Sequence, residues 1–254
     1  MKGKIILITG ATSGIGKGCA YKFASQGSNL ILNGRNIDKL NELKVELESS
    51  FGIEVQLLPF DVRYREEASE ALATLKGKWN NIDVLVNNAG LVFGMDKEFE
   101  GNFDEWDIVI DTNIKGLLAM TRLVVPGMIG RGKGHIINIG SLAGDLAYPG
   151  GNVYCATKAA VKALSDGLRM DLVDTPLRVT NVKPGMVETN FTTHRFHGDK
   201  ERSDNFYKGI KPLNGDDVAE VVYFAASVPE HIQIAEVLVM PTNQASSAVC
   251  YKKE

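Results

Sequence analysis

The feature that most constrains the fold is a regular alternation of short apolar runs with longer amphipathic segments. Each run is rich in Ile, Val and Leu without clean polar alternation, as expected for parallel strands covered on both faces. The predicted strands lie near residues 4–9, 28–33, 53–59, 82–87, 134–140, 177–183 and 235–240. Helices are predicted between them, for example at Asp38–Ser50 and Tyr64–Lys76. This order predicts an α/β fold with a doubly wound, seven-stranded parallel sheet and helices on both faces.

Composition excludes several classes of partner. The chain has 254 residues, 44% hydrophobic and 23% charged, and its net charge of −3 gives no electrostatic reason to approach nucleic acid or an anionic membrane. The apolar run at residues 5–8 is too short for a signal peptide or a membrane span. Cys19, Cys155 and Cys250 show neither disulfide nor zinc spacing. We therefore expect a cytoplasmic protein without nucleic-acid or membrane partners.

A glycine-rich loop, Thr9-Gly10-Ala11-Thr12-Ser13-Gly14-Ile15-Gly16, directly follows the first predicted strand and precedes the helical stretch Lys17–Gln26. Its glycines allow the backbone to approach a pyrophosphate, which would lie against the free N–H groups of the helix start. The spacing is G-x-x-x-G-x-G rather than the commoner G-x-G-x-x-G. Simple turn chemistry is the alternative, but the flanking strand and helix favour a dinucleotide site.

The end of the second predicted strand favours NADP over NAD. It reads Asn33-Gly34-Arg35-Asn36, where an NAD site carries an acidic side chain for the ribose 2′-hydroxyl. Arg35 offers a planar fork for a 2′-phosphate, with the Ser13 hydroxyl alongside. The alternative is that Arg35 is a surface residue that opens the next helix.

A separate group of residues has the chemistry of a hydride-transfer site. Tyr154 and Lys158 stand at i and i+4 and share a helix face, and Ser141 precedes them. A close ammonium lowers the pKa of a phenol, and a shift from ~10 to ~7 takes on the order of 4 kcal/mol. We expect Tyr154 to act as an acid and base near neutral pH. A solvated helix face is the usual explanation for such a pair in isolation.

Together these motifs resemble the short-chain dehydrogenase/reductase family. The matching residues, in the family's order and spacing over nearly the whole chain, are Thr9-Gly10-x-x-x-Gly14-x-Gly16, Asn87-Asn88-Ala89-Gly90, Asn113, Ser141, Tyr154, Lys158 and Pro184-Gly185. Within the family, residues 134–141 and 148–154 are similar to the NADP-dependent 3-hydroxy acid dehydrogenases, which include serine dehydrogenases and malonic semialdehyde reductases. The resemblance implies one Rossmann-type domain over 1–254. It also implies a homotetramer built on the helices around 104–129 and 152–174 and the C-terminal segment.

The resemblance further implies individual roles. Ser141 would hold the substrate oxygen, Tyr154 would exchange its proton, and Lys158 would lower the phenol's pKa and bind the nicotinamide ribose. Asn113 would hold a water that relays protons, which completes the catalytic set. The residues expected to bind NADP are Gly10, Thr12, Ser13, Gly14, Ile15, Gly16, Arg35, Asn36, Asp61, Val62, Asn88, Ala89, Gly90, Tyr154, Lys158, Pro184, Gly185, Val187 and Thr189.

The polar stretch near 190–214 is predicted to be a substrate lid, because long insertions of this kind often cover a site. Its Arg195 is expected to bind a substrate carboxylate, while Ser141 and Tyr154 hold the reacting oxygen. A small 3-hydroxy acid such as serine or 3-hydroxypropanoate is the favoured substrate. Reduction of a 3-oxoacyl thioester or another carbonyl remains open, as does a non-catalytic NADP(H)-binding sensor or scaffold. The intact Ser141, Tyr154 and Lys158 argue against the last.

Three other residues of the lid stretch, His194, His197 and Asp199, have the side chains of metal ligands. No helical pattern places them on one face, and a lid is polar simply to stay soluble, so no metal is predicted. Cys155, beside Tyr154, is interpreted as a small residue that packs a helix rather than as a reactive thiol.

Overall fold

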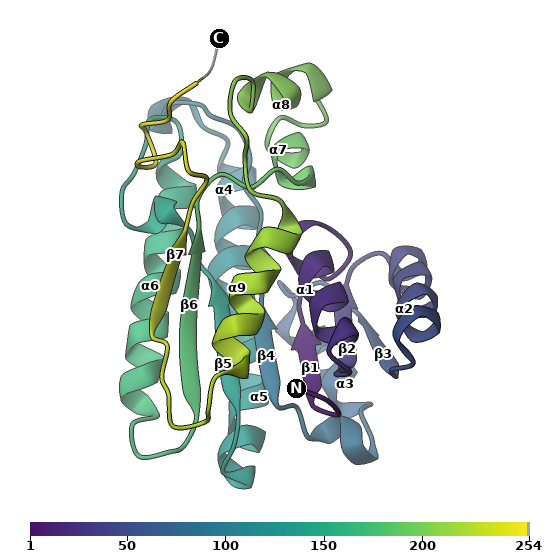
Figure 1. Ribbon diagram of the computed structural model, residues 1–254. Helices are drawn as coiled ribbons and strands as arrows, with labels where there is room; N and C mark the ends of the chain where they lie inside the picture. Colours follow the sequence, from purple (N-terminus) through teal and green to yellow (C-terminus); the bar gives the residue numbers. More distant parts are fainter. Residues whose placement is uncertain (253–254) are drawn as a thin grey trace.

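The computed structural model describes residues 1–252 and is built on a seven-stranded, all-parallel sheet (Figure 1). The strands are β1 Ile5–Ile8, β2 Asn29–Gly34, β3 Val55–Pro59, β4 Val84–Asn87, β5 His135–Ile139, β6 Arg178–Pro184 and β7 Glu236–Val239. Their order across the sheet is β3-β2-β1-β4-β5-β6-β7. The predicted doubly wound fold is confirmed, and each observed strand begins and ends within two residues of its predicted limits.

Helices alternate with the strands along the chain. They are α1 Gly14–Ser25, α2 Ile37–Phe51, α3 Arg65–Ala73, α4 Phe103–Ile110, α5 Leu117–Arg131, α6 Asn152–Asp171, α7 Asn190–Arg195, α8 Lys200–Phe206 and α9 Gly215–Ser227. Short 3₁₀ turns are η1 Gly77–Asn80, η2 Glu98–Glu100 and η4 Leu142–Gly144, and a π-helical turn, η3 Asp111–Gly116, joins α4 to α5. Local sequence sets the helix ends. Asn36 caps α2 by accepting from the Lys39 N–H, and Gly52 ends α2 at φ 63°.

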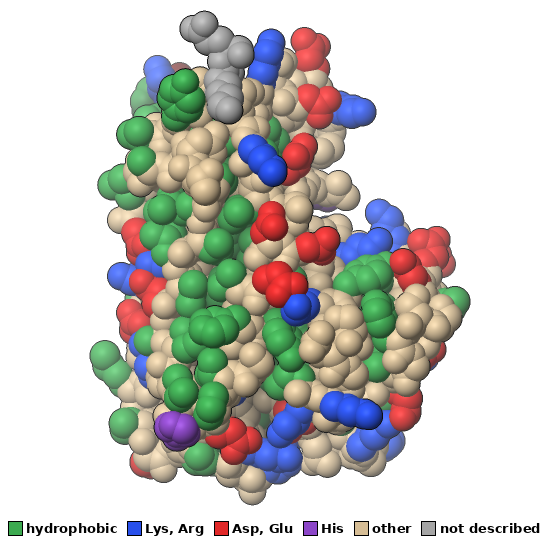
Figure 2. Space-filling view, viewed as in Figure 1, with side chains coloured by type: hydrophobic (Ala, Val, Ile, Leu, Met, Phe, Trp, Pro, Cys, Tyr) green, Lys and Arg blue, Asp and Glu red, His purple; other side chains and the backbone are tan. Residues whose placement is uncertain are grey.

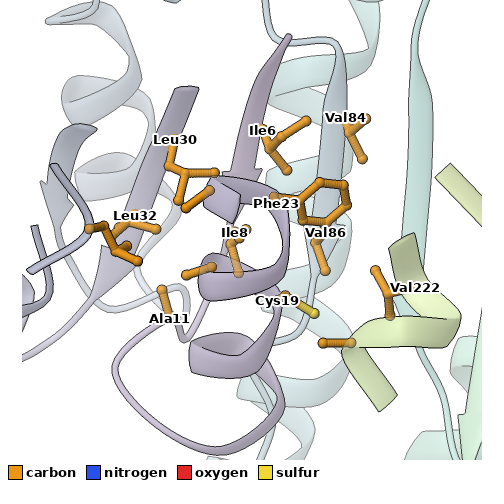
Figure 3. Close-up of a cluster of buried hydrophobic side chains, with 14 of the residues drawn as sticks. Ile6, Ile8, Ala11, Cys19, Phe23, Leu30, Leu32, Val84, Val86 and Val222 are labelled. Carbon is orange, nitrogen blue, oxygen red and sulfur yellow. The ribbon is translucent and has the colours of Figure 1, made fainter. Parts of the chain in front are cut away.

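Two hydrophobic layers hold the helices against the sheet. On one face α1, α2 and α9 pack on alternate strand residues such as Ile6 and Ile8, with Phe23 at the centre (Figure 3). On the other face α3, α5 and α6 cover the intervening residues Ile5 and Leu7. Because both faces of each central strand are buried, the strands need the continuous apolar runs seen in the sequence. Each fully buried side chain of this size contributes roughly 1.5–3 kcal/mol.

A glycine contact brings α9 against α1. A Cβ at Gly18 would lie 2.7 Å from the Gly215 carbonyl carbon, and a Cβ at Gly215 would lie 2.6 Å from the Gly14 carbonyl oxygen. Any larger residue would separate the two helices. The start of α9, and with it the end of the segment that carries α7 and α8, therefore lies beside the glycine-rich loop.

The parallel sheet sends every strand's carboxyl end to one edge, the upper edge in Figure 1. Residues 190–214, here called the lid segment, contain α7 and α8 and lie over this edge, and the chain that follows β7 returns to the same side. Among residues 1–252, no helix combines the length and apolarity needed to cross a membrane.

Candidate active site

The carboxyl ends of the strands border one large cavity of about 1030 Å³, and Figure 2 shows the surface hollowed between the lid segment and the part formed by α1 and α2. Most of the residues predicted to bind ligand line it: Gly10, Thr12, Ser13, Gly14, Ile15, Arg35, Asp61, Val62, Asn88, Ala89, Gly90, Ser141, Tyr154, Lys158, Pro184, Gly185, Val187, Thr189 and Arg195. Gly16, Asn36 and Asn113 lie outside this lining. Gly16 packs behind the loop, Asn36 caps α2, and Asn113 is buried beneath the floor.

The glycine-rich loop is held in place by Asn88. The Asn88 Nδ2 donates to the carbonyls of Thr9 at 2.8 Å and Gly10 at 3.1 Å. Gly10 has φ 64°, and a Cβ at Gly16 would lie 2.3 Å from the Gly10 oxygen, so both positions require glycine. Ser13 precedes α1 without using its hydroxyl as a cap. The loop therefore offers that hydroxyl and the open N–H groups of the helix start to an anion.

Asn88 was expected to contact the cofactor, but its amide is used within the protein. The preceding residue, Asn87, donates to Thr121 at 3.1 Å and to the Asn138 side chain at 2.9 Å. The two asparagines thus tie β4 to β1 and β5. Asn88 still lines the cavity, together with Ala89 and Gly90, which follow it.

At the far end of the cavity, two arginines surround Asp61. Arg63 donates to Asp61 Oδ2 through Nε at 3.1 Å and Nη2 at 2.8 Å, and Arg35 Nη1 lies 3.9 Å from the same oxygen. Burial alone would raise the pKa of the Asp61 carboxyl, but the hydrogen bonds from Arg63 hold it below its usual value. The Arg35 side chain is 61% exposed and reaches into solvent at the cavity rim. It remains free to turn toward a phosphate, whereas Arg63, which sequence reasoning missed, is occupied.

Ser141, Tyr154 and Lys158 meet at the opposite end. Ser141 follows β5, where its Oγ accepts from the Ala143 N–H at 3.1 Å, and Tyr154 and Lys158 project from the first turns of α6. The buried Lys158 Nζ donates to the Ile139 carbonyl at 2.8 Å and lies 5.8 Å from the centre of the Tyr154 ring. Burial lowers the pKa of Lys158 to about 8. The predicted helix face therefore does bring the ammonium beside the aromatic ring.

The pKa of Tyr154 departs from the prediction. Burial raises it, Tyr148 raises it further, and the hydrogen bond with Ser141 and the charge of Arg195 only partly oppose this. Lys158 is not among the groups that lower it, and its ammonium donates to the Ile139 carbonyl. In this arrangement Tyr154 carries its proton at neutral pH and is poised as an acid.

Asn113 lies on the π-helical turn η3 and is bonded to α6, the helix that carries Tyr154 and Lys158. Its Nδ2 donates to the Leu91 carbonyl and to Thr157 Oγ1, both at 3.0 Å, and its Oδ1 accepts from the Leu91 N–H at 2.9 Å. A Cβ at Gly90 would be 3.3 Å from Asn113 Oδ1 and 3.6 Å from Lys158 Nζ. Asn113 and Lys158 thus flank the same glycine.

Arg195 enters the cavity from α7. It is only 5% exposed, its Nε donates to the Gly94 carbonyl at 3.0 Å, and its Nη2 donates to the Tyr148 hydroxyl at 2.7 Å. The backbone repeats the contact, because the Gly94 N–H donates to the Arg195 carbonyl at 2.8 Å. Within residues 1–252 no carboxylate pairs with this guanidinium.

Sequence reasoning missed several residues of the cavity wall. Apart from Tyr148, the additional aromatic residues are Phe60, Phe93, Phe191, Phe206 and Tyr207, and the chain after β7 adds Gln244, Ser247, Ala248, Cys250 and Lys252. The Gln244 Oε1 accepts from the Met186 N–H at 2.8 Å and closes the wall beside Gly185. No periodic pattern in the sequence marks these positions. Only their closeness in sequence to the lid segment and to the C-terminal end could have indicated that they line the cavity.

The two histidines of the lid segment have different surroundings. His194 lines the cavity, whereas His197 stacks on Phe93 and lies 3.5 Å from a Glu105 oxygen. In the described part of the chain, no three His, Cys, Asp or Glu side chains gather as metal ligands would. Cys155 is a buried residue of α6, and burial raises the pKa of its thiol.

Comparison with known proteins agrees with this geometry. A family model described as short chain dehydrogenase matches residues 4–200. The NADP-dependent 3-hydroxy acid dehydrogenase of Schizosaccharomyces pombe is 43% identical over 255 residues, which cover 100% of this chain and 98% of that protein. The NADP-dependent 3-hydroxy acid dehydrogenase YdfG of Escherichia coli K12 is 45% identical over 241 residues, 94% of this chain and 96% of that protein.

Solved structures give the same result. The closed form of a serine dehydrogenase complexed with NADP⁺ superposes with a TM-score of 0.93 at 43% identity, covering 98% of this chain and 100% of that chain. The serine dehydrogenase from Escherichia coli gives a TM-score of 0.83 at 42% identity, covering 95% and 99%. The family resemblance predicted from the sequence motifs is confirmed.

The position of Arg35 generates a test of cofactor choice. Arg35→Asp should weaken NADP⁺ binding by at least about tenfold, because a charge-assisted hydrogen bond is worth roughly 1.5–3 kcal/mol, and should change NAD⁺ binding far less. Titration calorimetry with each nucleotide measures this. Arg65→Asp is the matched control, since Arg65 is exposed, pairs with Glu66 and is absent from the cavity lining. Equal effects of Arg35→Asp on both nucleotides would show that Arg35 does not bind the 2′-phosphate.

Proposed function

This chain belongs to the short-chain dehydrogenase family, and from that premise we propose that it is an NADP-dependent oxidoreductase acting on a small 3-hydroxy acid. It transfers a hydride between the nicotinamide and the 3-hydroxy or 3-oxo carbon of a substrate such as serine or 3-hydroxypropanoate. The observation that carries the proposal is that Ser141, Tyr154 and Lys158 line the same cavity as the glycine-rich loop. Relatives of similar length named as NADP-dependent 3-hydroxy acid dehydrogenases support it.

The residues of the cavity fit NADP. The glycine positions admit no side chain, and the Ser13 hydroxyl and the start of α1 suit the pyrophosphate and 2′-phosphate. Arg35 stands exposed at the rim, 3.9 Å from Asp61, whose carboxylate is already engaged by Arg63, so the Arg35 guanidinium is free to bind a phosphate. A Cβ at Gly14 would lie 3.0 Å from Thr189 Cγ2, so the chain after β6 lies beside the glycine-rich loop, which supports a position for Thr189 next to the pyrophosphate. When bound, the nicotinamide supplies or accepts the hydride.

The catalytic side chains move the proton. Ser141 holds the substrate oxygen, and Tyr154 gives its phenolic proton to that oxygen in reduction or accepts one in oxidation. The raised pKa of Tyr154 keeps the proton on the phenol until the substrate oxygen becomes basic. Lys158, whose buried ammonium also lines the cavity, would bind the ribose hydroxyls of a bound nucleotide. Asn113, fixed by three hydrogen bonds to Leu91 and Thr157, would hold a water that relays protons from this group to solvent.

The charge of Arg195 supports an acid as substrate. A guanidinium that is nearly fully buried carries a large desolvation cost, and protein groups normally offset it with a carboxylate. Its partners here are a carbonyl and a phenol, both neutral. A substrate carboxylate in the cavity would provide the missing negative charge. This sets a 3-hydroxy acid ahead of a neutral alcohol.

Assembly and location are part of the same proposal. Large apolar side chains are exposed on the helices that the family resemblance assigned to a homotetramer, including Leu118 and Ile129 on α5 and Met170 on α6. Figure 2 shows further hydrophobic side chains gathered over α9 and β7, among them Phe224 and Leu238. Exposed apolar patches of this kind mark protein interfaces. Three scattered, unpaired cysteines suit a cytoplasmic setting.

The proton-transfer role of Tyr154 predicts a specific kinetic defect. Tyr154→Phe should lower kcat by at least ~10², as expected when a general acid is removed, while NADPH affinity stays close to that of the unmodified protein. Tyr21→Phe makes the same chemical change outside the cavity and should be silent. Lys158→Ala should instead weaken NADPH binding. Near-normal turnover by Tyr154→Phe would favour a non-catalytic NADP(H)-binding role.

The buried cation predicts a charge-dependent effect on substrate. Arg195→Ala should reduce kcat/KM for 3-hydroxypropanoate by ~10-fold or more, yet change that for neutral 1,3-propanediol by far less, since only the acid loses an ion pair. Steady-state rates with both substrates measure the ratio. Arg202→Ala on α8, whose guanidinium packs over Phe196, should leave the ratio unchanged. Equal losses for acid and diol would make Arg195 a structural residue.

The exposed helix faces predict self-association. Sedimentation velocity at micromolar concentration should give a tetramer, and Met170→Asp should shift it to smaller species because it buries a charge at a contact between copies. Val45→Asp changes a similarly exposed apolar residue on α2, which lies outside the expected interface, and should have no effect. A stable monomer of the unmodified protein would contradict the assembly.

A further inference from the structure

Tyr148 is hydrogen-bonded to Arg195 in the wall of the cavity. It lies between the 3₁₀ turn η4 and helix α6, in the stretch that also leads to Tyr154. Its hydroxyl oxygen accepts from Arg195 Nη2 at 2.7 Å, and the guanidinium lies 5.4 Å from the centre of its ring. Both residues line the cavity. Two side chains that are 47 positions apart in sequence therefore form one polar unit at the substrate end.

The Tyr148 hydroxyl has an unused donor. A phenol both donates and accepts, and here the lone pair is engaged by Arg195. Within residues 1–252 the hydroxyl makes no second hydrogen bond, so its proton is available to a ligand. Burial raises the pKa of Tyr148, which keeps that proton on the oxygen at neutral pH. A charged donor and a neutral donor are thus held side by side.

We propose that Tyr148 and Arg195 together form the carboxylate subsite, in which Tyr148 donates its phenolic hydrogen to one carboxylate oxygen and Arg195 faces the other. This inference rests on the proposed function and deepens it, because it names the second group that recognises the acid. Two donors at one carboxylate also fix its orientation, which a single cation does not.

The subsite is rigid. Arg195 is joined to Gly94 by both a side-chain and a backbone hydrogen bond, and its guanidinium lies between the rings of Tyr148 and Phe206, 5.9 Å from the centre of the latter. The lid segment, the loop after β4 and the loop after β5 are thus connected at one point. A carboxylate bound there is held at a set distance from the phenol of Tyr154.

The subsite lies in the same cavity as the reacting group. Tyr148 and Arg195 line the cavity that Ser141 and Tyr154 also line, and Tyr148 stands six positions before Tyr154 in the chain. The cavity therefore suits a substrate that carries a carboxylate besides its hydroxyl.

The decisive experiment compares two substrates of similar size in one variant. Tyr148→Phe should lower kcat/KM for 3-hydroxypropanoate by about tenfold, mainly through KM, because a hydrogen bond to a charged group is lost. The value for 1,3-propanediol should change by no more than about twofold, since the lost donor serves the charged end only. Tyr207→Phe is the matched control. Its hydroxyl also borders the cavity but donates to the Val187 carbonyl at 2.8 Å, so any loss should affect both substrates in proportion.

Direct binding separates recognition from turnover. Calorimetry with propanoate, which carries the carboxylate but no hydroxyl, should show about tenfold weaker binding to NADP⁺-saturated Tyr148→Phe than to the unmodified protein. NADP⁺ affinity should be unchanged, which also reports that the variant is folded. If folding is impaired, Tyr148→His, which keeps a ring and an N–H donor, replaces it and should retain part of the preference for the acid.

The outcomes distinguish the two proposals. If the unmodified protein does not prefer 3-hydroxypropanoate to 1,3-propanediol, the proposed substrate class is wrong. If the preference exists and survives Tyr148→Phe with propanoate binding intact, the function stands and the Tyr148 inference is overturned. A proportional loss for both substrates also overturns it, because that result assigns Tyr148 a structural role.

Discussion

The parallel direction of all seven strands is the constraint on which the site depends. A parallel strand must be reached by a crossover, so helices cover both faces and every carboxyl end arrives at the same edge. Each strand then contributes to one cavity. The contributing residues, in strand order from β1 to β7, are Gly10, Arg35, Asp61, Asn88, Ser141, Gly185 and Gln244. Residues spread over more than 230 positions of sequence meet because all seven strands end at this edge of the sheet.

Buried polar ties turn this edge into a fixed surface. Asn88 holds the backbone of Thr9 and Gly10, and Asn87 bonds Asn138, whose Nδ2 donates to Ser165 on α6 at 2.9 Å. Buried amides without partners would be costly, so the network admits few alternative arrangements. The glycine-rich loop and α6, which carries Tyr154 and Lys158, are thereby joined through the sheet.

Sequence patterns predicted what is local and left open what is not. The strands followed from apolar runs, and nearly all cavity residues proposed from motifs do line it, because each motif stands where a parallel strand ends. The i, i+4 spacing of Tyr154 and Lys158 correctly put them on one helix face. It did not predict that Lys158 would donate to Ile139, which lies on β5, so the expected lowering of the phenol's pKa was not found. Tyr148 was missed for the same reason, since only the tertiary structure brings Arg195 to it.

The two halves of the cavity are built by different means. The half that fits the nucleotide depends largely on backbone geometry, where close approach requires glycine at positions 10 and 16. The half that faces the substrate depends on side chains of the lid segment and of the loops after β4 and β5, which meet at Arg195. A change of side chain there alters recognition without disturbing the sheet edge. Chemistry and cofactor are therefore tied to the fold, whereas the choice of substrate rests on a few contacts that the fold itself does not dictate.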